Sequence, residues 1–108
     1  MTAVYSATKA ALHSYAMSQR HRLRGSSVAV QEIAPPWVRT ELLNSQSEER
    51  AIPLDQFIAG TMAALGTDAE EVLVEEARLF RANPGPGEHA LVNQFNDILA
   101  ANPPADLA

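Results

Sequence analysis

Apolar side chains recur at helical spacing along most of this chain, and they predict three long helices. Residues 3–24 contain no proline and carry small or apolar side chains close to one stripe, which is typical of a single helix. Similar stripes predict helices over residues 54–65, ended by Gly66, and over residues 88–101. The stripe of the first helix holds Val4, Ala7, Ala11, Tyr15 and Ser18. The expected inward-facing side chains are Leu54, Phe57, Ile58, Met62 and Leu65 in the second helix, and Leu91, Val92, Phe95, Ile98 and Leu99 in the third.

Two short segments have the composition of strands. Residues 28–34 are rich in β-branched side chains and stop at two prolines, which cannot continue a central strand. Residues 72–74 form a brief apolar run that could be strand or helix; we favour a strand, followed by a helix over residues 75–82. The order strand, helix, strand fits one right-handed crossover unit with parallel strands.

Polar and turn-forming residues separate these elements. The loop over residues 35–52 is predicted to hold a short helix near residues 40–45, and the Asn, Pro and Gly run over residues 83–87 predicts a break before the last helix. With 108 residues the chain is one domain at most, and residues 102–108 are predicted to fray.

Charge and composition disfavour several classes of function. The net charge of −5 argues against nucleic acid as a partner, and the one basic cluster, residues 20–24, lies where cations favour a helix C-terminus. The chain has no cysteine, no apolar run that approaches a membrane span and no signal peptide, so we expect a cytoplasmic protein. His13, His21 and His89 lack metal-ligand spacing, so we assign them to the surface and predict no metal site.

Tyr5 and Lys9 are the candidate chemical pair. A spacing of four places both side chains on one helical face, one turn apart. An ammonium near a phenol stabilises the phenolate, and the positive end of a helix N-terminus acts in the same direction. Such a phenol can exchange protons at neutral pH. A tyrosine and a lysine at this spacing are common in helices and usually have no catalytic role. The neighbouring residues therefore decide whether the pair is functional.

The neighbours resemble the short-chain dehydrogenase/reductase family. The run from Tyr5 to Leu12, followed by a helix, an apolar strand and the segment Pro35–Thr40, is similar to that family's catalytic region. The segment Glu32–Leu42 more closely resembles a bacterial branch labelled as involved in teichoic-acid D-alanylation. The resemblance covers roughly residues 3–97. It implies an α/β fold: the C-terminal fragment of a Rossmann-type doubly wound fold, mostly helical with about two short parallel strands.

The same resemblance implies an NAD(P)-dependent oxidoreductase that moves hydride between nicotinamide and a carbonyl or alcohol. Tyr5 would exchange the proton with the substrate oxygen. Lys9 would assist Tyr5 and hold the nicotinamide ribose. The remaining implied residues are Pro35, Val38 and Thr40 for the cofactor and Trp37, Leu42 and Leu43 for the substrate. Neither the substrate nor the choice between NAD and NADP is implied.

One feature of the family is missing from these residues. The Gly-rich turn that grips the cofactor pyrophosphate precedes the tyrosine helix in the family, and no G-x-G-x-x-G pattern occurs here. We therefore expect a truncated copy that binds no cofactor and is inactive by itself; a start codon called inside a longer gene and a degraded gene both fit. The alternative is a non-catalytic module that associates with itself through the first helix and an exposed strand edge.

Overall fold

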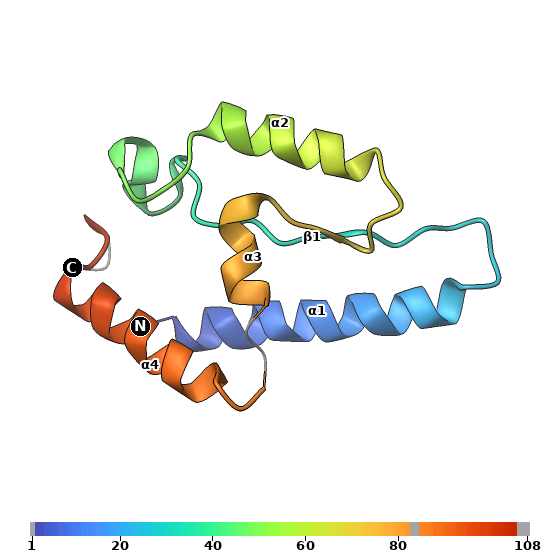
Figure 1. Ribbon diagram of the computed structural model, residues 1–108, viewed down its shortest axis with the longest axis horizontal. Coiled ribbons are helices and arrows are strands. Elements are labelled where there is room, and N and C mark those ends of the chain that lie inside the picture. The colour runs from blue at the N-terminus through green and yellow to red at the C-terminus, as the bar shows by residue number, and fades with distance from the viewer. Residues whose placement is uncertain (1, 83–84, 106–108) are drawn as a thin grey trace.

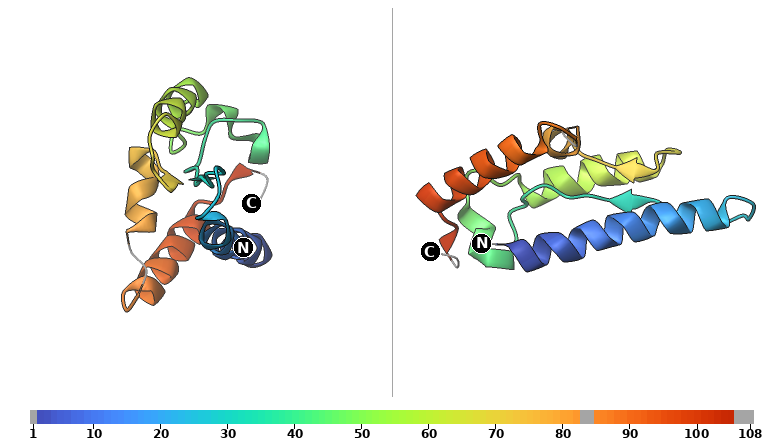
Figure 2. Two further views of the ribbon diagram at one scale, coloured as in Figure 1. Left: turned by 90° about the vertical axis from the view of Figure 1, so that its right-hand side faces the viewer. Right: turned by 90° about the horizontal axis from the view of Figure 1, so that it is seen from below.

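The computed structural model describes residues 2–82 and 85–105, and helices dominate them. The elements follow the order α1 (Ala3–Leu23), β1 (Glu32–Ile33), the 3₁₀ helix η1 (Leu42–Ser47), α2 (Leu54–Leu65), β2 (Glu71–Val72), α3 (Glu75–Arg81) and α4 (Glu88–Ala101). Figure 1 shows α1 and α2 on opposite sides of the strands, and the end view of Figure 2 agrees. The predicted α/β class, with two short parallel strands and a helical majority, is confirmed.

Helix α1 forms over almost the whole predicted span, since good helix formers dominate it and no proline interrupts it. Its last turn carries Arg20, His21 and Arg22, which complement the negative end of the helix dipole, and it ends just before Gly25. None of its described side chains is buried. The helix lies along one side of the molecule (Figure 1), and most of its side chains are exposed.

The two strands pair in parallel, with Glu32 opposite Glu71 and Ile33 opposite Val72. Backbone N–H groups of Glu32 and Ala34 donate to the carbonyl groups of Glu70 (3.0 Å) and Val72 (3.3 Å). The predicted strand over residues 28–34 is too long, because only Glu32–Ile33 is paired in it. The composition of residues 28–31 favours a strand, but a strand also needs a partner, and β2 is only two residues long.

Side chains alternate between the two faces of this small sheet. Glu32 and Glu71 lie on one face, and Ile33 and Val72 lie on the other. Val72 is 1% exposed and belongs to the small core, whose buried apolar residues among those described are Ala51, Val72 and Ala77. Helix α2 packs against β2, and a Cβ added at Gly60 would lie 3.1 Å from the Val74 side chain. The sheet thus separates an apolar face from an acidic one.

The bounds of α2 and α4 match the prediction, whereas their inward faces match it only in part. Thr61 is the buried residue of α2, Phe57 and Leu65 are half-buried, and Leu54, Ile58 and Met62 are exposed. In α4 the exposed side chains include Val92, Phe95 and Ile98, while Leu91 and Leu99 are half-buried. A two-stranded sheet offers only a narrow surface, so it cannot cover a full apolar stripe on each helix.

The segments that connect or follow the helices and strands can also be compared with the predictions. The short helix expected near residues 40–45 is η1 at Leu42–Ser47, which contains Leu43 and Asn44 at positive φ (57° and 48°). Residues 83–84 of the predicted break lie outside the described residues. Of the tail that is predicted to fray, residues 102–105 are described: Arg50 Nη1 donates to the Asn102 carbonyl (2.9 Å), and Pro104 is buried. Within the described part of the chain, no helix has both the length and the apolar character needed to cross a membrane.

Candidate functional site

Helix α1 brings Tyr5 and Lys9 together near its N-terminus. The Lys9 Nζ atom lies 5.2 Å from the centroid of the Tyr5 ring, which is a cation–π contact. Tyr5 is 58% exposed, and the Thr8 hydroxyl donates to its backbone carbonyl at 2.7 Å. The predicted juxtaposition of phenol and ammonium on one helical face is thus present, and both groups are open to a ligand or to another part of a larger protein.

The segment Pro35–Thr40 follows β1, as expected of a loop at the carboxyl end of a parallel strand. Val38 bridges to Ile52: the Ile52 N–H donates to the Trp37 carbonyl (3.0 Å), and the Arg39 N–H donates to the Ile52 carbonyl (2.9 Å). In such a parallel bridge the N–H and C=O of Val38 itself point to the side away from Ile52. The Thr40 hydroxyl oxygen accepts from the Leu42 N–H (3.3 Å), and its O–H can still donate.

Trp37 anchors the segment that follows this loop. Its indole N–H donates to the hydroxyl of Ser45 (2.8 Å), which is almost completely buried, and the Arg50 guanidinium lies over the indole, 5.0 Å from the ring centroid. A cavity of about 530 Å³ opens here, and Trp37 and Leu43 both line it. Leu42 is 69% exposed. Two of the three expected substrate residues therefore share one cavity.

The rim of this cavity carries a strong ion pair. Arg50 Nε and Nη2 each donate to a different oxygen of Glu48, at 2.8 and 2.7 Å, and the Arg50 backbone N–H donates to the same carboxylate (3.0 Å). The side-chain hydrogen bonds from Arg50, followed by its backbone N–H, hold the pKa of Glu48 at about 2. The same pairing raises the pKa of Arg50. Arg50 thereby ties Trp37, Glu48 and the Asn102 carbonyl into one unit.

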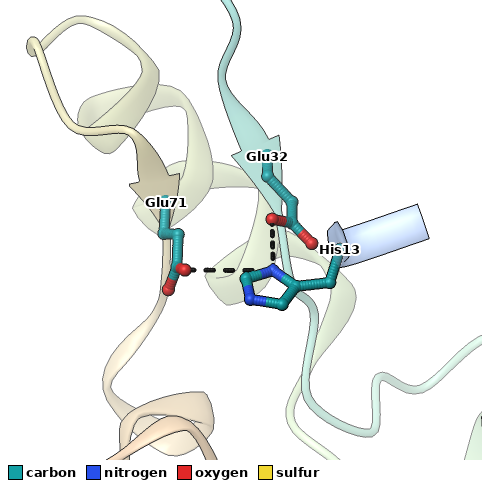
Figure 3. A group of neighbouring side chains, drawn as sticks. All are labelled: His13, Glu32 and Glu71. Carbon is teal, nitrogen blue, oxygen red and sulfur yellow. Dashed lines mark hydrogen bonds and ion pairs between the residues drawn. The ribbon is translucent and has the colours of Figure 1, made fainter. Parts of the chain in front are cut away.

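A second polar cluster lies on the acidic face of the sheet (Figure 3). His13 Nδ1 is 2.7 Å from Glu32 Oε2 and 3.9 Å from Glu71 Oε1. Arg81 from α3 binds both oxygens of Glu71, each at 2.7 Å, and its Nη2 lies 3.1 Å from His13 Nε2. We refer to His13, Glu32, Glu71 and Arg81 as the junction, because they join α1, β1, β2 and α3. The assignment of His13 to the surface is wrong: its side chain is 27% exposed and has close partners.

The tautomer of His13 decides the hydrogen bonds of the junction. A guanidinium can only donate, so the 3.1 Å contact from Arg81 is a hydrogen bond only in the tautomer that leaves His13 Nε2 unprotonated. In that tautomer the Nδ1–H donates to Glu32. The hydrogen bonds from Arg81 lower the pKa of Glu71 and raise that of Arg81. His13 thus lies between two carboxylates, and the Arg81 guanidinium contacts both Glu71 and the imidazole.

Sequence reasoning missed the junction although one signal was available. Each strand reads as an acidic residue followed by an apolar one, and parallel pairing in register places the two acidic residues opposite each other. Like charges so placed repel and require a counter-charge. His13 follows Lys9 by one helical turn and Tyr5 by two, so the junction and the predicted catalytic pair lie along the same side of α1.

Comparison with known proteins supports the resemblance. Residues 1–51 match the short chain dehydrogenase family, a range that includes Tyr5, Lys9 and the segment Pro35–Thr40. The chain is also 35% identical, over 99 residues, to the "Uncharacterized oxidoreductase DltE" of Bacillus subtilis (strain 168). That alignment covers 86% of this chain and 39% of DltE, so the chain spans about two fifths of the length of that relative.

No solved structure matches the chain significantly. The family match and the relative agree with each other and with the parallel-stranded α/β fold. The chain is therefore a relative of the short-chain dehydrogenases: residues 1–51 carry that family's sequence, and most of its length is similar to an oxidoreductase.

Proposed function

We propose that this chain supplies the proton-transfer part of a cytoplasmic NAD(P)-dependent oxidoreductase that interconverts a carbonyl and an alcohol. The observation that carries the proposal is the position of the Lys9 ammonium over the Tyr5 ring, on an open face of α1 and within the segment that matches the family. Tyr5 donates its phenolic proton to the carbonyl oxygen during reduction, or accepts the proton of the alcohol during oxidation. The positive charge of Lys9 stabilises the phenolate that remains.

The residues present fit the nicotinamide end of such a cofactor. A bound nicotinamide dinucleotide supplies or accepts the hydride. The backbone N–H and C=O of Val38, which point away from Ile52, would hold the carboxamide, beside the hydroxyl of Thr40 and the rigid ring of Pro35. Lys9 would hold the ribose. Trp37, Leu42 and Leu43 would supply the apolar contacts to the substrate; Trp37 and Leu43 line a common cavity, whose other walls are mostly polar.

The 108 residues offer no comparable site for the pyrophosphate end of the cofactor. Its usual binding site is a Gly-rich turn at a helix N-terminus, and the sequence contains no G-x-G-x-x-G pattern. We therefore expect the 108-residue chain to show no NADH or NADPH binding in a calorimetric titration and no reductase activity. Saturable binding of either cofactor by this chain would contradict that expectation.

A chimera tests the catalytic assignment directly. The segment of DltE that aligns with this chain is replaced by the corresponding residues of this chain, and oxidation of NADH and NADPH is followed with a panel of aldehydes and ketones. Tyr5→Phe in the chimera should lower the rate by about 100-fold or more, since it removes the transferred proton. Lys9→Met should lower it as well, and His21→Gln should have little effect. An active chimera that tolerates Tyr5→Phe would exclude the proposed role.

The exposed apolar side chains of α1 favour a second candidate function, self-association. Val4, Leu12 and Tyr15 are all exposed on this helix. Covering them with a second copy of the chain would remove apolar surface from water. Sedimentation at micromolar concentration should then show a dimer or larger species, and Leu12→Glu should shift it toward monomer. A clean monomer in the parent chain would exclude this candidate without affecting the catalytic proposal.

A further inference from the structure

The junction has the composition of a transition-metal site. Its potential ligand atoms are one imidazole nitrogen of His13 and one carboxylate oxygen each of Glu32 and Glu71, and all lie within 4.8 Å of one another. Imidazole and carboxylate together are ligands typical of zinc, whereas magnesium and calcium favour oxygen alone. The side chains are 27, 19 and 24% exposed, so the cluster is sheltered but open to an ion from solution.

The ligand atoms come from three separate elements of the fold, as Figure 3 shows. His13 projects from α1, and Glu32 and Glu71 project from paired positions of β1 and β2. In a tetrahedral zinc site, neighbouring ligand atoms lie roughly 3.3 Å apart. The distances here, 2.7 Å from His13 Nδ1 to Glu32 and 3.9 Å to Glu71, fall on either side of that value. Small side-chain rotations would equalise them.

We propose that His13, Glu32 and Glu71 bind a divalent transition-metal ion of the zinc class, and that Arg81 is the resident counter-cation that the metal displaces. Arg81 hydrogen-bonds to Glu71 but not to Glu32, which pairs with His13. Arg20 is the other nearby cation; its charge also lowers the pKa of Glu71, but its guanidinium donates to the backbone carbonyls of Val30 and Glu70. A dication bound by both carboxylates would neutralise Glu32 and Glu71 together, which Arg81 does not.

Arg81 and the metal exclude each other for a reason that can be measured. A metal on Nδ1 of His13 takes the lone pair that the proton on Nδ1 now occupies, so the ring proton must move to Nε2. Nε2–H cannot accept the hydrogen bond that Arg81 Nη2 now donates. The metal also competes with Arg81 for the oxygens of Glu71. Metal binding is therefore coupled to a change of imidazole tautomer and to release of the guanidinium.

The test is a calorimetric titration of zinc chloride into the 108-residue chain, prepared without a polyhistidine tag, with far-ultraviolet circular dichroism to check folding. We expect one site per chain that magnesium does not compete for. Glu32→Gln, which keeps the shape of the side chain, and His13→Gln should each weaken zinc binding by about tenfold or more. His21→Gln, an exposed histidine on the same helix, is the matched control and should leave the affinity unchanged.

Two further measurements separate this site from adventitious zinc binding by surface groups. Arg81→Gln should tighten zinc binding by about fivefold, because the competing cation is gone. Imidazole nitrogen spectra should show the His13 proton moving from Nδ1 to Nε2 as zinc is added. The proposal is overturned if the chain binds no zinc, if Glu32→Gln and His13→Gln bind as tightly as the parent, or if the tautomer stays unchanged at saturation. An Arg81→Gln variant that binds no more tightly would overturn the displacement role.

Discussion

The N-terminal end and the middle of α1 place polar groups in opposite ways. At its N-terminal end, Tyr5 and Lys9 are neighbours along one helix, exposed, and in contact mainly with each other. At its middle, His13 meets Glu32, Glu71 and Arg81, which come from three other elements and are partly buried. The first pair depends on local geometry, so it survives wherever the helix forms. The junction depends on the packing of the whole chain. We therefore expect the junction to contribute to the stability of the fold, and the Tyr5–Lys9 pair to contribute little.

The largest expected effect comes from the apolar face beneath the junction. Val72→Ala should lower the free energy of unfolding by about 2 kcal/mol, because Val72 is 1% exposed and its loss leaves a cavity between β2 and its neighbours. Urea unfolding followed by circular dichroism measures the change. Val28→Ala, at an exposed position outside the sheet, is the control and should cost less than about 0.5 kcal/mol. Equal effects at the two positions would mean that β2 does not form the core.

The junction itself should give the next largest effect. Glu71→Gln removes the charge that Arg81 binds through two hydrogen bonds, and we expect a loss of about 1–2 kcal/mol in the free energy of unfolding. The same urea experiment measures it. Glu75→Gln, in an exposed ion pair with Arg78, is the matched control and should change stability by less than about 0.5 kcal/mol. A Glu71→Gln variant as stable as this control would remove the contrast between the junction and the exposed surface.

The ion pairs of Glu48 and Glu71 with arginine should make the protein less stable as the pH falls. The pKa of Glu48 falls from 4.5 to about 2 on folding, and the pKa of Glu71 is also lowered, in both cases chiefly by arginine hydrogen bonds. A lowered pKa means that the folded form binds fewer protons, so the stability is present above the unfolded pKa and is lost as the pH falls through the folded value. Stability should therefore decline between about pH 4.5 and pH 2, and Glu48→Gln should make that decline shallower. Urea midpoints at several pH values measure it, and an unchanged slope would contradict the pairing with Arg50.

The smallest effect is expected at Tyr5 and Lys9, the predicted catalytic pair. Tyr5→Phe and Lys9→Met should each change the free energy of unfolding by less than about 0.5 kcal/mol, because Tyr5 is exposed and a surface cation–π contact stabilises little. Thermal and urea unfolding of the two variants measure this. A loss as large as that of Glu71→Gln would show that the N-terminal end of α1 is packed in solution, as self-association would require.

Features that depend on local geometry could be predicted from the sequence, and features that depend on tertiary packing could not. Helices α2 and α4 begin and end where the sequence indicates, since Pro53, Gly66 and the break before Glu88 act on the local backbone. The buried faces of these helices were predicted only in part, because burial depends on which residues of other elements lie opposite. The strand over residues 28–34 was predicted too long for the same reason: its partner β2 has only two residues. The roles of Tyr5, Lys9, Pro35, Val38 and Thr40 remain predictions.

The sequence by itself determined the helices, the parallel order of the strands, the relationship to short-chain dehydrogenases and the placement of Tyr5 and Lys9 on one face. The helices and the placement of Tyr5 and Lys9 follow from the spacing of residues along the chain, and the relationship follows from the similarity of the sequence to that family. Only the tertiary structure decided which side chains are buried and that His13, Glu32, Glu71 and Arg81 meet. Their distances depend on the strand register and on how α1 and α3 pack against the sheet, and no local spacing encodes those two quantities.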